Sequence, residues 1–199
     1  MAPAKRSAPR TVVRGEPVVQ DVLDATMAEL AEVGYRALRI DDVAARAGVH
    51  KTTVYRRWPE KSDLVREALA RSLGETPAPD TGSFRDDLLA LARHVVDVCS
   101  STFGASTVRM VMAEHNEKDV RKLVDTLRRT KEEPFLHVLR RARARGELRA
   151  DADDELILAM LVGTLQHVMF AMGERATEAL VERLVDTIVE GVGRRPKRR

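Results

Sequence analysis

The sequence has little of what disulfide-rich, strand-rich and secreted proteins require. Cys99 is the single cysteine among 199 residues, which excludes an internal disulfide framework and fits a reducing, cytoplasmic compartment. Aromatic residues make up only 4% of the chain, and strand-favouring residues are sparse outside short apolar stretches. This composition predicts an all-α protein. The basic N-terminus has no apolar run behind it, so it does not have the pattern of a secretory signal.

Long hydrophobic runs are also nearly absent. The exception is residues 156–173, which carry no formal charge and just reach the length of a membrane span. Gln166 and His167 lie in the middle of this stretch, and Glu155 and Glu174 bound it without a basic flank. We therefore expect no membrane partner, but a helix that is buried inside the protein or in a subunit interface.

The motifs of enzymes and metal sites are missing as well. The sequence has no glycine-rich phosphate loop, no H-E-x-x-H and no nucleophile elbow. His94, His137 and His167 fall on separate predicted helices, His115 lies at the break between two of them, and Cys99 lies five residues from His94. Since no pair has the i, i+3 or i+4 spacing of ligands on one helix, we predict no catalytic residue, no metal site and no cofactor.

Positive charge is concentrated at the two ends of the chain. Residues 1–14 and 194–199 carry nine basic residues and no acid; removing them from the overall charge of +3 leaves residues 15–193 at −6. The pI of about 9.2 therefore describes the tails and is no argument that the body binds nucleic acid. We interpret 1–14 as a disordered basic arm and 194–199 as a basic tail. Either they only solvate the ends, or they add salt-dependent affinity for phosphate.

Apolar residues recur at helical spacing through most of the chain, with breaks at Gly34, Gly48 and Pro59 in the first part. The pattern there predicts helices at 18–33, 43–47, 51–58 and 59–73. The first three would form a small three-helix domain that contains a helix-turn-helix.

Residues 74–83 contain two Pro and two Gly and form the one interior cluster of helix breakers. We place the domain boundary there, between a small N-terminal domain at 15–73 and a larger helical domain at 74–193. Further helices are expected at 84–101, 105–114, 117–145, 153–173 and 176–191, for about nine in total. Gly104 is expected to separate two of them, and Pro134 to kink or split the long one.

The stretch from Val43 to Lys61 reads VAARAGVHKTTVYRRWPEK and contains two short amphipathic helices on either side of Gly48. Val49, Val54 and Trp58 can close a small core, which leaves the polar residues of the second helix outside. A helix that presents Thr and Arg in this way matches a recognition helix in the DNA major groove. From spacing alone, a solvated basic corner that never touches DNA remains the alternative.

Residues 22–64 resemble the N-terminal domain of the tetracycline-repressor (TetR) family. The matching pattern is Gly34-Tyr35, Ile40-x-x-Val43-Ala44-x-x-Ala47-Gly48-Val49, Val54-Tyr55, Trp58 and Lys61-x-x-Leu64. By position, the resemblance implies base or near-base contacts from Thr52, Thr53 and Arg56. It implies phosphate contacts from Arg39, Lys51, Tyr55, Arg57 and Lys61.

Four positions depart from the family's usual pattern. Arg39 stands where the family usually has Thr or Ser, and His50 where it usually has Ser. Arg57 replaces Tyr or His, and Trp58 replaces Phe. Because these changes make the DNA-facing side more basic, we add His50 to the predicted contacts; they also leave the operator sequence unknowable.

The C-terminal half is expected to hold an effector pocket and a dimer interface. Met and Phe give an adaptable lining and a few polar groups orient a ligand, although the same residues can be plain core. The predicted pocket residues are Phe103, Met110, His115, Phe135, Gln166, His167 and Phe170. Broad apolar helix faces favour self-association, since paired half-sites need a two-fold dimer. The predicted interface residues are Leu161, Leu165, Leu180, Leu184 and Ile188.

Taken together, the sequence predicts a homodimeric, sequence-specific transcriptional regulator and no enzyme. It would bind a palindromic operator in double-stranded DNA as a repressor and be released by a small hydrophobic effector. One alternative is a DNA-binding regulator or nucleoid-type protein without a small-molecule ligand. Another is a helical ligand-binding or scaffold protein whose N-terminal corner does not touch DNA.

Overall fold

The computed structural model describes residues 16–72 and 74–193, so the predicted basic arm and basic tail lie outside the described residues. Within these ranges the regular structure is helical, apart from one isolated β-bridge between Leu148 and Gly193. This confirms the all-α prediction. α8, η1, α9 and η2 follow one another without a break, so the described helices form nine runs, as expected.

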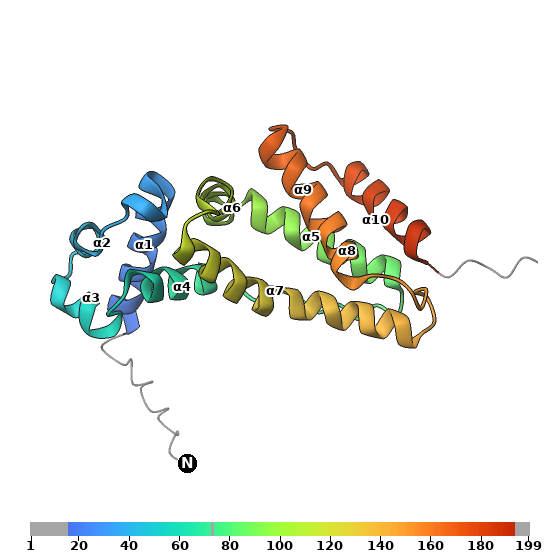
Figure 1. The fold of residues 1–199 in the computed structure, drawn as a ribbon, viewed down its shortest axis with the longest axis horizontal. Helices are drawn as coiled ribbons and strands as arrows, with labels where there is room; N and C mark the ends of the chain where they lie inside the picture. Colours follow the sequence, from blue (N-terminus) through green and yellow to red (C-terminus); the bar gives the residue numbers. More distant parts are fainter. Residues whose placement is uncertain (1–15, 73, 194–199) are drawn as a thin grey trace, which may run out of the picture.

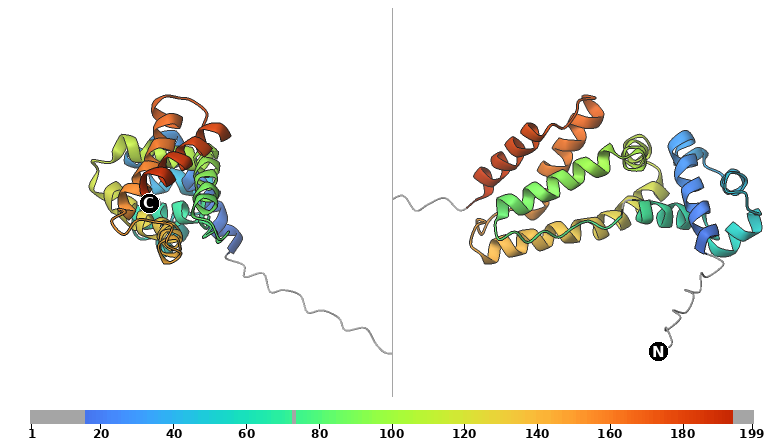
Figure 2. Two further views of the ribbon diagram at one scale, coloured as in Figure 1. Left: turned by 90° about the vertical axis from the view of Figure 1, so that its right-hand side faces the viewer. Right: turned by 180° about the vertical axis from the view of Figure 1, so that it is seen from behind.

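The helices divide between two ends of an elongated molecule (Figure 1). One end contains α1 (Glu16–Ala37), α2 (Ile40–Arg46), α3 (Lys51–Arg57) and α4 (Lys61–Ser72). The rest consists of α5 (Phe84–Ser100), α6 (Thr102–Glu114), α7 (Lys118–Ala144), α8 (Asp154–Leu158), η1 (Ala159–Gly163), α9 (Thr164–Gln166), η2 (His167–Ala171) and α10 (Glu178–Val192). Seen from behind, α5 and α7 run along the body, and α10 lies on its outer side (Figure 2).

Most helix boundaries follow from local chemistry. Gly34 interrupts α1 with a φ of 77°, a conformation that residues with a Cβ rarely adopt, and one more helical turn follows it. Ser83 begins α5 by accepting a hydrogen bond from the Asp86 N–H, and Thr177 begins α10 in the same way.

The predicted break at Gly104 is wrong. α6 begins at Thr102, after Ser101, whose hydroxyl accepts a hydrogen bond from the Gly104 N–H at 3.0 Å. Gly104 lies inside the first turn of α6, close to the end of α5. Any other residue there would place its Cβ against the carbonyl oxygen of Val98. The glycine therefore permits a tight corner between two helices. Of the two outcomes predicted at Pro134, a kink or a split, the split does not occur, since α7 continues through this residue.

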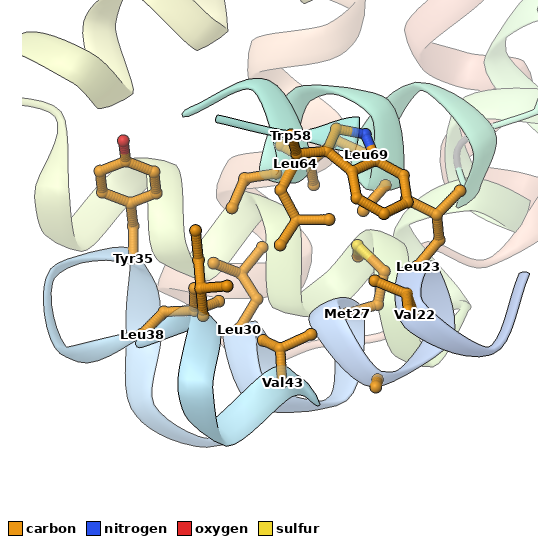
Figure 3. Close-up of a cluster of buried hydrophobic side chains, with 14 of the residues drawn as sticks. Val22, Leu23, Met27, Leu30, Tyr35, Leu38, Val43, Trp58, Leu64 and Leu69 are labelled. Carbon is orange, nitrogen blue, oxygen red and sulfur yellow. The ribbon is translucent and has the colours of Figure 1, made fainter. Parts of the chain in front are cut away.

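Two apolar cores lie inside the molecule. The first joins α1–α4 through side chains such as Leu30, Trp58 and Leu64 (Figure 3). It also includes Met110 of α6 and Val120 and Leu123 of α7. The second lies between α5, α7, the α8–η1 run and α10, around residues such as Phe84 and Phe135. The segment 74–83 contains no helix, as predicted, yet the first core takes side chains from beyond it. The helix-turn-helix end is therefore packed onto the rest of the chain and does not close a core alone.

Candidate nucleic-acid interface

α2 and α3 form the helix-turn-helix that the sequence predicts. Gly48, with a φ of 66°, ends α2, and the N–H of Val49 reaches back to the carbonyl of Ala44 at 3.0 Å. This is the hydrogen bond of a Schellman ending, which needs a residue in the left-handed conformation. Val54 is 0% and Trp58 3% exposed, and Val49 packs against the same core. The predicted inward side of α3 is thus confirmed.

The opposite side of α3 is open to solvent. Among the predicted contacts, the exposed residues are Arg39, His50, Lys51, Thr52, Tyr55, Arg56 and Arg57. Thr53 is half-buried. The structure therefore brings these eight side chains to the α3 end of the molecule. Lys61, the first residue of α4, is half-buried and is described below.

Most basic side chains at this end already have an acidic partner. Arg46 binds Glu29 and Glu32 of α1 at 2.7 and 2.5 Å, and Lys51 lies 3.5 Å from Asp41. In contrast, neither Arg39 nor Arg56 forms an ion pair within the described part of the chain. Arg56 is the unneutralised base on the recognition helix, which makes its guanidinium available to an external acceptor.

His50 is held by one of its neighbours. Its Nδ1 lies 3.0 Å from the hydroxyl of Thr52. His50 is the N-terminal cap residue of α3, but its side chain makes no capping hydrogen bond. The contact therefore orients two predicted DNA contacts together at the start of the recognition helix.

Lys61 has a structural role that the sequence did not predict. Its ammonium donates to the carbonyls of Tyr35 and Arg36 at 2.9 and 3.4 Å and lies 4.5 Å from the centre of the Tyr35 ring. These are the free carbonyls at the end of α1, so Lys61 caps that helix. The predicted phosphate contact is then better supplied by the backbone N–H groups at the start of α4.

Acidic residues from α6 and α7 hold the same turn from the other side. Glu114 accepts a hydrogen bond from the Arg36 N–H at 3.0 Å, and Glu117 lies 3.7 Å from the Arg36 guanidinium. Burial, together with a hydrogen bond to Asp119, raises the pKa of Tyr35 to about 12. A Cβ on Gly34 would lie 2.5 Å from a Glu114 carboxylate oxygen, so the glycine also makes room for this contact.

The structure does not bring the predicted pocket residues together around one cavity. Met110 is in the first core and Phe135 in the second. His115 and His167 are exposed, and Phe103 is 36% exposed. Gln166 and Phe170 are half-buried, and the Phe170 ring has the Arg109 guanidinium 5.7 Å from its centre. The void beside Phe135 is too small for a water molecule. An effector site there remains a prediction, and it requires the core to open.

A different hollow lies between the two ends of the molecule. It is an open cleft of about 870 Å³ between the end of α3, α4, the segment after α4 and α7. Its lining contains as many acidic as basic side chains. The lining residues are Arg57, Trp58, Asp63, Arg66, Glu67, Ala70, Gly74, Glu75, Thr76, Thr126, Leu127, Lys131 and Pro134. No local sequence pattern predicts this cleft, because its lining residues come from several segments of the chain.

The predicted interface residues are mostly turned inward. Leu161, Leu165 and Ile188 are 0% exposed inside the second core, and Leu180 and Leu184 are half-buried. The three fully buried residues cannot form an intermolecular surface without unpacking, so their assignment as contacts needs correction. The exposed residues of the α8–η2 run are Glu155, Leu156, Ala159, Gly163, Thr164, His167 and Ala171, and the exposed Met172 caps its end. Asp154–Ala171 is apolar and long enough to cross a membrane, yet only 22% of it is buried within this chain.

Comparison with known proteins matches both halves of this arrangement. Residues 22–68 match the description "Bacterial regulatory proteins, tetR family", and residues 78–188 match "Tetracyclin repressor-like, C-terminal domain". The chain belongs to the TetR family.

Its similarity extends over whole relatives. It is 31% identical over 194 residues to the HTH-type transcriptional regulator AqdR of Rhodococcus erythropolis, covering 96% of this chain and 93% of that protein. It is 33% identical over 187 residues to the DNA-binding transcriptional repressor TetR of Mycobacteroides abscessus, covering 89% and 95%. The chain is accordingly a helix-turn-helix transcriptional regulator of the TetR family.

Solved structures share the fold. The TetR family transcription regulator SCO0332 superposes with a TM-score of 0.65 at 30% identity, covering 88% of this chain and 98% of that one. FadR from Bacillus subtilis, solved in complex with stearoyl-CoA, has a TM-score of 0.71 at 18% identity, covering 87% and 98%. At that identity the second likeness concerns the fold alone.

The role of Lys61 can be measured with Lys61→Met, which keeps the apolar stem and removes the ammonium. We expect the free energy of unfolding to fall by about 1–2 kcal/mol, because the carbonyls at the end of α1 lose a charged donor. Chemical denaturation measures this. The matched control is Lys122→Met, an exposed lysine on α7 whose side chain has no partner among residues 16–72 and 74–193, which should leave stability unchanged. Unchanged stability together with a weaker salt dependence of DNA binding would instead assign the ammonium to phosphate.

Proposed function

We propose that this regulator acts as a homodimer that reads a palindromic operator and represses transcription, and that a small hydrophobic ligand releases it. The observation that carries DNA reading is the division of α3 into two sides. Val54 and Trp58 anchor the inner side in the first core, while Thr52, Thr53 and Arg56 are on or near the outer side. A rigid helix with an unpaired arginine has the chemistry for bidentate contact with guanine. A protein that represses transcription by binding an operator would be located in the cytoplasm.

Self-association is supported by the outer face of the α8–η2 run. Leu156 and Met172 are 57% and 53% exposed at its two ends, and small residues such as Ala159 and Gly163 lie between them. Small side chains let a second helix approach closely, and exposed apolar residues are stabilised by burial. A two-fold pairing of this face with α10 beside it would give a four-helix interface. Two recognition helices would then read two half-sites.

The ligand is supported less directly. The second core is apolar, and α7, which lines it with Phe135, also contributes Val120 and Leu123 to the first core. A molecule inserted there can therefore shift the recognition helix. The close packing beside Phe135 favours the second candidate, a regulator that binds DNA without a small-molecule ligand.

Arg56→Ala tests the reading of bases. We expect it to lose about 1–3 kcal/mol of preference for a duplex selected from a random pool, while binding to a scrambled duplex changes little. Fluorescence anisotropy with both duplexes measures the difference. Arg129→Ala, at an exposed arginine on α7, serves as the control and should change neither. Equal losses on the two duplexes would show that Arg56 does not read bases.

Ala159→Glu tests the dimer interface. A charge on the outward face would be buried without a partner in the proposed dimer, so the variant should be monomeric by light scattering at micromolar concentration, where the unchanged protein is a dimer. The control is Ala31→Glu, at an exposed position of α1, which should remain dimeric. A monomeric unchanged protein, or a dimeric Ala159→Glu, contradicts this interface.

Release by a ligand is tested by screening neutral and cationic lipophilic compounds against the preformed complex with the selected duplex. We expect at least one compound to raise the dissociation constant for DNA by about tenfold or more, which corresponds to a coupling of about 1.4 kcal/mol. If the protein holds its duplex against every compound while binding it normally, the ligand-free regulator is the correct function.

A further inference from the structure

Glu67 of α4 holds the end of the recognition helix with both oxygens of its carboxylate. Oε2 accepts a hydrogen bond from the Trp58 indole N–H at 2.8 Å, and Oε1 accepts one from the Arg57 guanidinium at 3.2 Å. Arg57 is the last residue of α3 and Trp58 is its C-terminal cap. One side chain of the next helix therefore fixes two consecutive residues where α3 ends.

The two partners of Glu67 have very different surroundings. Trp58 is 3% exposed in the first core, so its N–H needs an acceptor inside the protein. The Arg57 side chain is 53% and the Glu67 side chain 39% exposed, and the guanidinium lies 5.2 Å from the centre of the indole ring. Arg57 is thus folded back along α4 by an ion pair and by the ring it stacks on, whereas Arg56 has neither.

We propose that Glu67 is a positioning residue that sets the specificity of DNA binding by withholding Arg57 from the phosphate backbone. This inference rests on the proposed reading of DNA by α3. It changes the role of Arg57, which the family resemblance suggests as a phosphate contact. Contacts to phosphate strengthen binding to every sequence alike, so a carboxylate that neutralises one of them lowers non-specific affinity and leaves base reading to Arg56.

The charge arrangement explains why a carboxylate is needed at this position. The family resemblance leads us to expect Tyr or His where Arg57 stands, so the chain carries one more cation beside the duplex. Glu67 offsets that cation within hydrogen-bond distance. If the carboxylate were absent, Arg57 would be free to turn toward phosphate, and each such contact adds about 0.9 to the slope of log affinity against log salt.

Glu67→Gln tests this directly, because the amide oxygen can still accept the Trp58 N–H while the negative charge is lost. Binding to a mixed-sequence 30-base-pair duplex is measured by anisotropy over a series of salt concentrations. We expect the salt slope to become steeper by about 0.9 and non-specific affinity at moderate salt to rise about three- to tenfold. The ratio of specific to non-specific affinity should fall.

Two further variants test whether the freed Arg57 guanidinium causes the steeper salt slope. The double variant Glu67→Gln with Arg57→Ala should return the salt slope to that of the unchanged protein, because the freed guanidinium is gone. Glu132→Gln, which removes a carboxylate paired with Arg128 on α7, should leave the slope as it was. Trp58 is the only tryptophan of the chain, so its emission reports the packing at this point. The emission maximum should remain that of a buried indole in Glu67→Gln.

The outcomes separate this inference from the proposed function. An unchanged slope in Glu67→Gln, or a steeper slope that persists in the double variant, overturns the role of Glu67 while DNA binding stands. If the unchanged protein binds neither duplex at low salt, the proposed DNA reading fails and the inference fails with it.

Discussion

The packing of Trp58 and Val54 into the first core is the constraint on which the DNA-reading end depends. α3 has only seven residues, too few to be stable alone in water, so its geometry is set by what its inner side contacts. That core includes Met110 of α6 and Val120 and Leu123 of α7. Any shift of α6 or α7 therefore changes the packing of the core that holds the recognition helix. In this way a conformational change in the C-terminal half can alter DNA binding.

Most basic side chains at the helix-turn-helix end are paired with groups of the protein itself. Arg46, Lys51 and Arg57 each have an acidic partner nearby. The ammonium of Lys61 donates hydrogen bonds to the carbonyls at the end of α1. A strongly basic surface would bind any duplex, since affinity for phosphate ignores sequence. Pairing most cations internally while Arg56 stays unpaired favours selectivity over raw affinity, in agreement with a body whose net charge is negative.

Sequence reasoning succeeded where a local rule decides the structure. Gly34 and Gly48 have positive φ values at the two breaks that the sequence predicts, and Trp58 is buried as the i, i+4 spacing from Val54 predicts. It failed where the partner is distant in the chain. The pairing of Glu67 with Trp58, the role of Lys61 and the contact of Glu114 with Arg36 have no local signal. Periodicity likewise identifies apolar faces in α8–η2, but it cannot tell whether Leu161 or Ala159 faces the chain's own core; two π-helical segments shift that register further.

Hydrogen exchange of the protein with and without a duplex selected from a random pool tests the central claim most directly. The account predicts slower backbone exchange in α3 and in the first turn of α4 when DNA is bound, because these segments supply the contacts and the phosphate-facing N–H groups. Saturated binding that leaves exchange in α3 unchanged, with protection in the α5–α10 body instead, would contradict it.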